Sequence, residues 1–125
     1  MENGRMRGDL QLRTKEFALS IVRLYSTLPK RREAQVIGDQ VLRSGTSVGA
    51  HFREAQRAKS NPDFVNKLDG GMQELEETSY WLELLEEAEL CDQNRLEPLK
   101  KEAGELMAIL VTIVNTKAQM KKSVL

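Results

Sequence analysis

Few residues in this sequence are of the types that perform catalysis, and they form no catalytic pattern. His51 is the only histidine and Cys91 the only cysteine, and nothing near either residue indicates a nucleophile with its base. Glu54 follows His51 at a spacing of three, but a two-iron bundle needs two Glu-x-x-His motifs, and no glutamate precedes a histidine in that way. We therefore expect a protein that is not an enzyme and that has no cofactor and no metal site.

Basic residues are the second chemical feature, because they gather in and beside one predicted helix, residues 31–59. The planar guanidinium of arginine fits phosphate oxygens, which makes the backbone of RNA or DNA a candidate ligand. A basic run at a helix start is unfavourable against the helix dipole, and this also indicates a partner. The candidate nucleic-acid-binding residues are Lys30, Arg31, Arg32, Arg43, Arg53, Arg57 and Lys59.

A second interpretation of these residues stays open at this point. The arginines could form a solvated face, or they could pair with acidic residues of the predicted helix over residues 63–89. Four carboxylates align along one side of that helix, Asp69, Glu76, Glu83 and Glu87. This acidic stripe is typical of a solvated helix face rather than of paired catalytic carboxylates.

The same segment, residues 63–89, carries more apolar surface than one small bundle needs. At about 100° per residue, Leu82 faces the core while its large apolar neighbours spread around the rest of the helix. A helix that is apolar nearly all round is buried on more than one side, so a second protein or another copy of the chain must cover it. The alternative is that these side chains lie at the edge of the bundle. The candidate oligomer-interface residues are Tyr80, Trp81, Leu84 and Leu85.

Glycines inside the predicted helices need a reason, because each costs about 1 kcal/mol relative to alanine. Gly45 and Gly49 lie one turn apart in a run of small residues, which favours close packing of another helix. A phosphate-binding loop does not fit, because neither glycine-rich nucleotide motif is present. Gly70 and Gly71 indicate either a kink or a tight contact.

These features lie on four predicted helices, separated by prolines and polar breaks and each with apolar residues at helical spacing. Short connections between long helices favour antiparallel neighbours. The predicted fold class is therefore all-α, an antiparallel up-down-up-down four-helix bundle. The helices are expected at about residues 13–28, 31–59, 63–89 and 98–121, within a bundle domain over 13–121. Residues 1–12 are expected to be disordered or frayed, and residues 122–125 to form a frayed tail.

The chain has 125 residues, a length typical of one domain with a single core. The single cysteine excludes an internal disulfide, and no apolar stretch approaches the roughly 18 residues of a membrane span. We therefore expect a cytoplasmic protein with no membrane partner.

The zero net charge of the chain conceals two halves of opposite charge, with +6 over residues 1–67 and −6 over residues 68–125. This balance excludes histone-like binding but allows a local basic surface.

Two runs of sequence resemble one protein family: Leu42–Ala55 (LRSGTSVGAHFREA) and, after Lys67-Leu68, Glu77–Leu85 (ETSYWLELL). They are similar to the bacterial four-helix bundle proteins of the ribosomal intervening-sequence protein family, first noted in insertions within large-subunit rRNA genes. The resemblance covers about residues 14–117. Two departures from the family pattern stand out, since asparagine is usual at the position of His51 and larger helix-formers are usual at Gly70-Gly71.

The resemblance implies an antiparallel four-helix bundle, often assembled as a ring of five. A related branch, the accessory variability determinant of diversity-generating retroelements, pairs with a reverse transcriptase and binds nucleic acid through a basic surface. We therefore predict a non-catalytic homo-oligomer, most simply a pentamer. It would bind RNA or DNA through the basic surface of residues 31–59, as an accessory factor beside a protein partner. The alternative is a protein–protein interaction scaffold that docks partners at Tyr80–Leu85 and does not contact nucleic acid.

Overall fold

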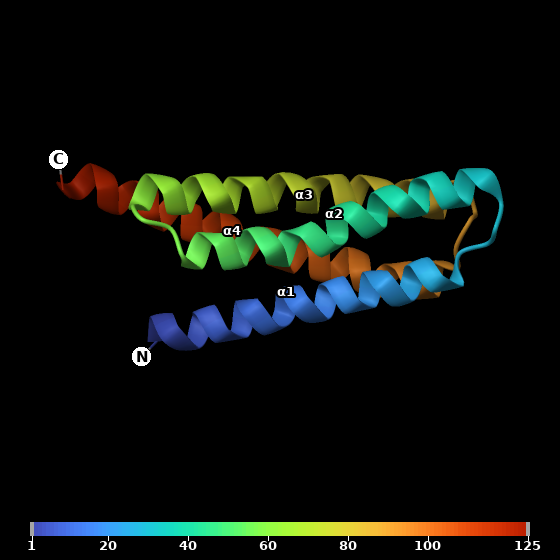
Figure 1. Ribbon diagram of the computed structural model, residues 1–125, viewed down its shortest axis with the longest axis horizontal. Helices are drawn as coiled ribbons and strands as arrows, with labels where there is room; N and C mark the ends of the chain where they lie inside the picture. The colour runs from blue at the N-terminus through green and yellow to red at the C-terminus, as the bar shows by residue number, and fades with distance from the viewer. Residues whose placement is uncertain (1, 125) are drawn as a thin grey trace.

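The chain forms four helices, seen in a computed structural model that describes the backbone of residues 2–124 and the side chains of residues 8–117. They are α1 (Glu2–Thr27), α2 (Arg32–Gln56), α3 (Asn61–Glu87) and α4 (Gln93–Val124). Residues 2–124 contain no strand, so the prediction of an all-α protein with four helices is confirmed. Each helix packs beside the one before it and runs back along the long axis of the molecule (Figure 1).

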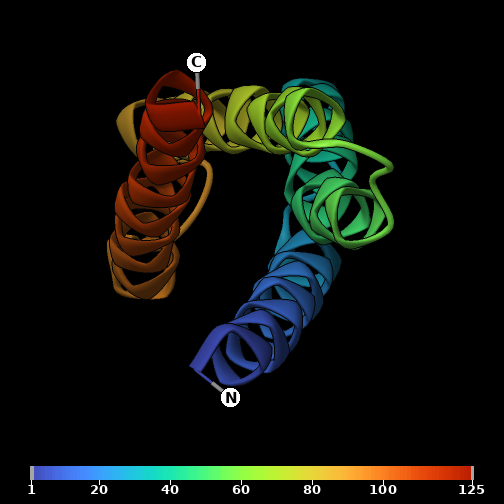
Figure 2. The same ribbon diagram turned by 90° about the vertical axis from the view of Figure 1, so that its left-hand side faces the viewer.

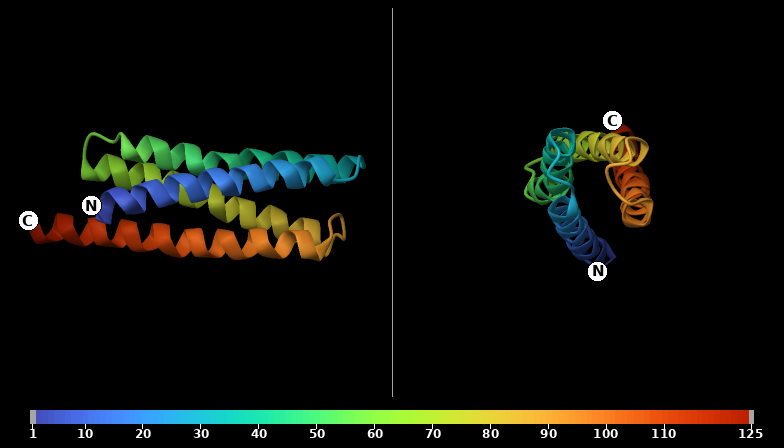
Figure 3. Two further views of the ribbon diagram at one scale, coloured as in Figure 1. Left: turned by 90° about the horizontal axis from the view of Figure 1, so that it is seen from below. Right: turned by 90° about the vertical axis from the view of Figure 1, so that its right-hand side faces the viewer.

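Seen along that axis, the helices follow an arc from α1 through α2 and α3 to α4 (Figure 2). The most extensive packing joins α2 to α3, and the least joins α1 to α4. The turn between α2 and α3 lies at the same end of the molecule as the start of α1 and the end of α4 (Figure 1). We call this the α2–α3 end. The other two turns lie at the opposite end, here called the α1–α2 end (Figure 3).

The core is built from one apolar stripe on each helix. On α1 and α2 the buried apolar members are Leu10, Phe17, Ile21, Leu24, Ala34, Val41, Val48, Phe52 and Ala55. On α3 and α4 they are Leu68, Leu75, Leu82, Leu85, Leu96, Leu99, Ala103, Leu106 and Leu110. None of the described helices is long and apolar enough to cross a membrane.

The first helix begins earlier than the sequence predicts. Residues 1–12 are expected to be frayed, but α1 starts at Glu2, and Leu10 is buried with 4% of its surface exposed. Leu10 lies one helical turn before Thr14 and two turns before Phe17, so it extends the apolar stripe and gains burial by staying helical. The side chains of residues 1–7 lie outside the described part of the chain.

The last helix also starts early, at Gln93 rather than near Pro98. Pro98 has no N–H to donate to the carbonyl of Asn94, but both residues are exposed and water can replace that bond. Asp92 starts the helix instead, because its carboxylate accepts from the Asn94 N–H at 3.1 Å. At the other end, residues 122–124 of the expected frayed tail continue α4, and their side chains lie outside the described residues.

Candidate nucleic-acid interface

The seven basic residues predicted to bind nucleic acid do not form one surface. With 25 residues, α2 is roughly 37 Å long. Lys30, Arg31 and Arg32 lie at its start, at the α1–α2 end of the molecule. Arg43 lies near its middle, and Arg53, Arg57 and Lys59 lie at and just beyond its end. The structure therefore separates the predicted site into three groups.

Arg43 is held by carboxylates of α3. Its guanidinium nitrogens lie 3.1 Å from Glu74 Oε2 and 2.9 Å from Glu77 Oε2. Hydrogen bonds to Glu77 and then Glu74 raise the pKa of Arg43. This is the pairing with α3 that the sequence leaves open as an alternative, although the two glutamates are not members of the predicted acidic stripe. Arg43 therefore ties α2 to α3, and its charge is balanced within the chain.

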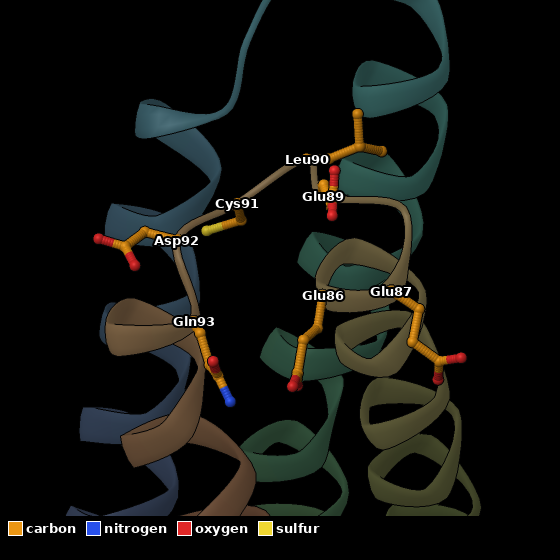
Figure 4. A pocket seen from close by; sticks show the side chains of 7 residues that line it. All are labelled: Glu86, Glu87, Glu89, Leu90, Cys91, Asp92 and Gln93. Atoms are coloured by element: carbon orange, nitrogen blue, oxygen red, sulfur yellow. The ribbon is translucent and has the colours of Figure 1, made fainter.

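The basic run Lys30-Arg31-Arg32 shares its end of the molecule with acidic residues. Arg31 Nε lies 3.2 Å from Glu33 Oε1. Beside the turn between α3 and α4, a hollow of about 640 Å³ is lined by Glu86, Glu87, Glu89, Leu90, Cys91, Asp92 and Gln93 (Figure 4). No group of three His, Cys, Asp or Glu side chains among the described residues could hold a metal ion. The α1–α2 end is thus a surface of mixed charge.

The α2–α3 end is different, because cationic residues of α3 and α4 lie at the same end as those at the close of α2. Arg53, Arg57 and Lys59 are exposed, and among the described residues none of them has a carboxylate partner. Lys67 of α3 and Lys117 of α4 join them at this end. The segments that reach it, residues 1–9, 51–70 and 106–125, contain nine lysines and arginines and five acidic residues.

A small hollow of about 270 Å³ opens on this surface between the α2–α3 turn and α4. Its lining includes the amine-bearing side chains of Lys59 and Lys117 and the polar residues Ser60 and Asn61, but no carboxylate. Lys117 Nζ lies 5.5 Å from the centre of the Phe64 ring. The one acidic side chain in the turn, Asp63, accepts the backbone N–H of Lys59 at 3.3 Å. The geometry therefore suits a phosphate group.

The sequence did not predict that α3 and α4 contribute to this surface. The predicted surface lies along one helix, whereas the described cations of the cluster come from the ends of α2, α3 and α4. One signal could have found it: if consecutive helices reverse direction, the start of α1, the end of α2, the start of α3 and the end of α4 must meet.

The predicted apolar interface on α3 is smaller than expected. Tyr80 is 53% exposed, and Trp81 and Leu84 are half-buried, with the Tyr80 and Trp81 rings edge to face at 5.0 Å. Leu85 is fully buried within the chain, so its placement in an oligomer interface is wrong. It follows Leu82 by three residues and therefore continues the core stripe of the same helix.

A second exposed apolar stripe lies on the outer face of α1, where the sequence offered no prediction. Leu12, Leu19 and Val22 are 55%, 43% and 45% exposed. Helical rotation places Leu12 and Leu19 opposite the core stripe of Phe17 and Ile21, with Val22 at one edge of this outer face. Their spacings of seven and three residues were readable in the sequence as a second apolar face.

Glycines allow close contacts on both sides of α2. A Cβ atom at Gly45 would lie 2.8 Å from Ile21 Cγ1, and one at Gly49 would lie 3.2 Å from Thr14 Oγ1, so α1 packs directly on this stretch of α2. On α3, a Cβ atom at Gly70 would lie 2.8 Å from His51 Cε1. These contacts fix the positions of α1 and α3 relative to α2, which carries Arg53 and Arg57.

Comparisons with known proteins agree with this architecture. Residues 9–112 match the family described as 23S rRNA-intervening sequence protein. The chain is also similar to a crystal structure of a protein with unknown function from the S23 ribosomal protein family of Bacteroides thetaiotaomicron VPI-5482. The two are 38% identical, with a TM-score of 0.81 over 87% of this chain and 97% of that one. No curated protein matches the chain.

Proposed function

Because the chain belongs to the 23S rRNA-intervening sequence protein family, we propose that it is a non-catalytic, homo-oligomeric protein that binds the phosphate backbone of RNA or DNA. The observation that carries this proposal is the basic cluster at the α2–α3 end. It replaces the surface along α2 that the sequence predicts, since Arg43 is paired and Lys30, Arg31 and Arg32 lie at the other end of that helix.

Electrostatics favours phosphate as the ligand of this cluster. Arg53 is exposed on the last turn of α2, Arg57 is exposed directly after the helix ends, and Lys59 follows in the turn. Exposed cations that contact phosphates release condensed counterions from the nucleic acid, and this term is independent of base sequence. We therefore expect binding that is sensitive to salt and indifferent to sequence.

Association of several copies would increase the affinity with which a cluster of this size binds nucleic acid. The stripe lies on α1 and the exposed patch of Tyr80, Trp81 and Leu84 lies on α3, and α2 stands between these two helices in the arc (Figure 2). A contact between two different faces of neighbouring copies is heterologous and closes into a ring when the rotation allows it. A ring of five, which the family resemblance implies, would present five basic ends together and raise the overall affinity for nucleic acid through multivalency.

Charge supports the pairing of these two faces. Lys15 is exposed beside the apolar stripe of α1, and Glu76 and Glu83 are exposed beside Tyr80 on α3. Opposite charges around an apolar centre fix the orientation of two partners and disfavour the wrong one. A second copy of the chain therefore fits both surfaces.

The binding test compares two sets of substitutions at opposite ends of the molecule. The variant Arg53→Gln/Arg57→Gln/Lys59→Gln removes the cluster, and Lys30→Gln/Arg32→Gln serves as the matched control. Fluorescence anisotropy with labelled single-stranded RNA and DNA measures the dissociation constant as salt is varied. We expect the first variant to bind at least about tenfold more weakly, with a shallower salt dependence, and the control to bind within about twofold of the native chain.

Unchanged affinity in the cluster variant would refute the proposed surface. Binding that does not weaken with salt would refute phosphate contacts altogether. Light scattering after gel filtration tests the assembly, for which we expect several times the 14.2 kDa of one chain. Leu19→Glu and Tyr80→Glu should each reduce that mass, and a native chain that is monomeric at micromolar concentration would contradict the ring.

Exposure of Tyr80 beside Trp81 and Leu84 favours a second candidate function, a scaffold that docks another protein without touching nucleic acid. The two candidates differ in a simple property of the purified protein. A nucleic-acid-binding protein carries material with an absorbance maximum shifted toward 260 nm and shows the salt-dependent binding described above. A scaffold shows neither.

A further inference from the structure

The seam between α1 and α4 contains a hollow of about 230 Å³ near the α1–α2 end. It is lined from α1 by Ser20, Arg23 and Leu24, and from α4 by Asn94, Arg95, Pro98 and Leu99. Two arginines from different helices thus line one hollow, and no acidic residue lines it. It is distinct from the basic cluster, which lies at the other end of the molecule.

The same seam is closed by opposite charges only a few turns away. Arg13 of α1 donates through Nε and Nη2 to the two carboxylate oxygens of Glu102 on α4, at 3.0 and 2.6 Å. Nη2 also lies 3.3 Å from Glu105. Near the α1–α2 end, α4 instead presents Arg95 toward the side of the seam where α1 carries Arg23.

Among the described residues, no acidic side chain forms an ion pair with Arg23 or Arg95. Neither Arg23 nor Arg95 makes an ion pair within residues 8–117. Asp92 precedes Arg95, but its carboxylate accepts the Asn94 N–H and lines the neighbouring hollow. Like charges on facing helices repel each other, so an anion between them would stabilise this end of the seam.

We propose that this hollow binds a single phosphate group, which bridges Arg23 of α1 and Arg95 of α4. Guanidinium groups bind phosphate oxygens through paired, charge-assisted hydrogen bonds. The hydroxyl of Ser20 and the amide of Asn94 supply further donors, while Leu24 and Leu99 form apolar walls. A volume below that of ordinary ligand pockets restricts the site to a small anion or to the terminal phosphate of a larger molecule.

The side chains, rather than the start of α4, carry this site. The backbone N–H groups of Arg95 and Leu96 both donate to the carbonyl of Asp92, and that of Asn94 is occupied as described. The first amides of the helix are therefore engaged within the chain. Substitution of either arginine is expected to abolish binding.

The test is the melting temperature of the full chain, measured with sodium phosphate against sodium chloride at matched ionic strength. A ligand that binds only the folded state raises that temperature in a saturable way. We expect a rise of about 5 °C at ten times the dissociation constant for phosphate. Arg23→Gln and Arg95→Gln should each lose the rise. Lys101→Gln, an exposed cation on α4 that does not line the hollow, should keep it.

Arg95→Glu provides an independent test, because it places a carboxylate across the seam from Arg23. We expect this variant to melt at a higher temperature than the native chain in chloride and to gain nothing from phosphate. The proposal is overturned if the native chain shows no phosphate-specific rise, or if the rise persists in both glutamine variants.

The source of the phosphate is distinguished by comparing inorganic phosphate with short oligonucleotides that do or do not carry a 5′-phosphate. A rise with inorganic phosphate alone assigns the site to the free ion, and a rise that also requires the 5′-phosphate assigns it to a terminal phosphate. The oligonucleotides are tested on the cluster variant Arg53→Gln/Arg57→Gln/Lys59→Gln, so that binding at the basic cluster does not contribute. A rise with the unphosphorylated oligonucleotide in that variant that survives Arg23→Gln contradicts the site. The cluster variant Arg53→Gln/Arg57→Gln/Lys59→Gln should keep the rise with inorganic phosphate. The phosphate site can therefore be tested even if the basic cluster does not bind nucleic acid.

Discussion

The imidazole of His51 on α2 lies directly against Gly70 on α3. A Cβ atom at Gly70 would lie 2.8 Å from His51 Cε1 and 2.9 Å from Nδ1, and one at Gly71 would lie 3.3 Å from His51 Cβ. The two departures from the family pattern therefore explain each other, because the ring occupies space that larger residues would fill. Since α3 is a single helix from Asn61 to Glu87, the glycine pair marks a tight contact between helices.

This contact predicts a coupling between the two positions. Gly70→Ala gains about 1 kcal/mol of helix propensity but pushes the ring of His51 away, so the native chain should gain nothing or lose up to about 2 kcal/mol of stability. In the His51→Ala background the same substitution should stabilise the chain by about 1 kcal/mol. Denaturant unfolding of the four proteins of this cycle measures the coupling.

Gly104 provides the control for this cycle, because a Cβ atom there meets nothing within 4 Å. Gly104→Ala should stabilise the chain by about 0.5–1 kcal/mol whether residue 51 is histidine or alanine. If Gly70→Ala gave the same gain in both backgrounds, the contact with His51 would carry no energy.

Gly45 is expected to be less tolerant than Gly70. A Cβ atom there would lie 2.8, 3.0 and 3.3 Å from three atoms of Ile21, whose branched side chain has little freedom to turn away. Gly45→Ala should therefore destabilise the chain by about 1–3 kcal/mol, despite its better helix propensity. Ile21→Ala removes both Cγ atoms that a Cβ at residue 45 would meet, so Gly45→Ala should cost less in that background than in the native chain. Equal stability of Gly45→Ala and the native chain in urea unfolding would contradict the close packing of α1 on α2.

The buried hydroxyl groups of Ser44 and Thr78 connect α2 and α3 by a hydrogen bond of 2.8 Å. Thr78 also bonds to the carbonyl of Glu74 at 2.8 Å, whereas the other contact of Ser44 Oγ, to the carbonyl of Val41, is 3.5 Å. Thr78→Val should therefore cost about 1–2 kcal/mol, because it leaves the hydroxyl of Ser44 without a good partner.

Ser44→Ala should cost less than Thr78→Val, because the threonine keeps its bond to the helix. The double variant Ser44→Ala/Thr78→Val should be more stable than the sum of the two single losses, since no buried hydroxyl is then left unsatisfied. Strict additivity in chemical denaturation would show that the two hydroxyl groups do not interact.

Cys91 is expected to react slowly with thiol reagents. Burial in the turn between α3 and α4 raises the pKa of its thiol, so less of the reactive thiolate is present near neutral pH. At pH 8 the folded chain should react with a disulfide reagent about threefold to tenfold more slowly than the unfolded chain. The rate should keep rising with pH beyond the ordinary thiol pKa. A rate in the folded chain equal to that of the unfolded chain would contradict this burial.

Much of the fold could be predicted from local patterns. The apolar spacing of Phe17, Ile21 and Leu24 on α1, and of its counterparts on the other helices, identified the core because burial of a helix follows its own periodicity. The same reasoning failed at Leu85 and at Leu10. Each of these residues lies where one apolar stripe ends, and only the position of the neighbouring helices decides how far the stripe is covered.

The sequence by itself determined that this chain forms four amphipathic helices and that α2 accepts a helix closely at Gly45, since both follow from side chains a few residues apart. Only the tertiary structure decided which charges act together. It paired Arg43 with Glu74 and Glu77, and it divided the other basic residues in and beside α2 between two ends of the molecule. It also placed Arg53 and Arg57 at the same end as Lys67 of α3 and Lys117 of α4. The physical reason is that electrostatic interactions depend on distance in space, and residues far apart in the chain become neighbours only when the helices pack.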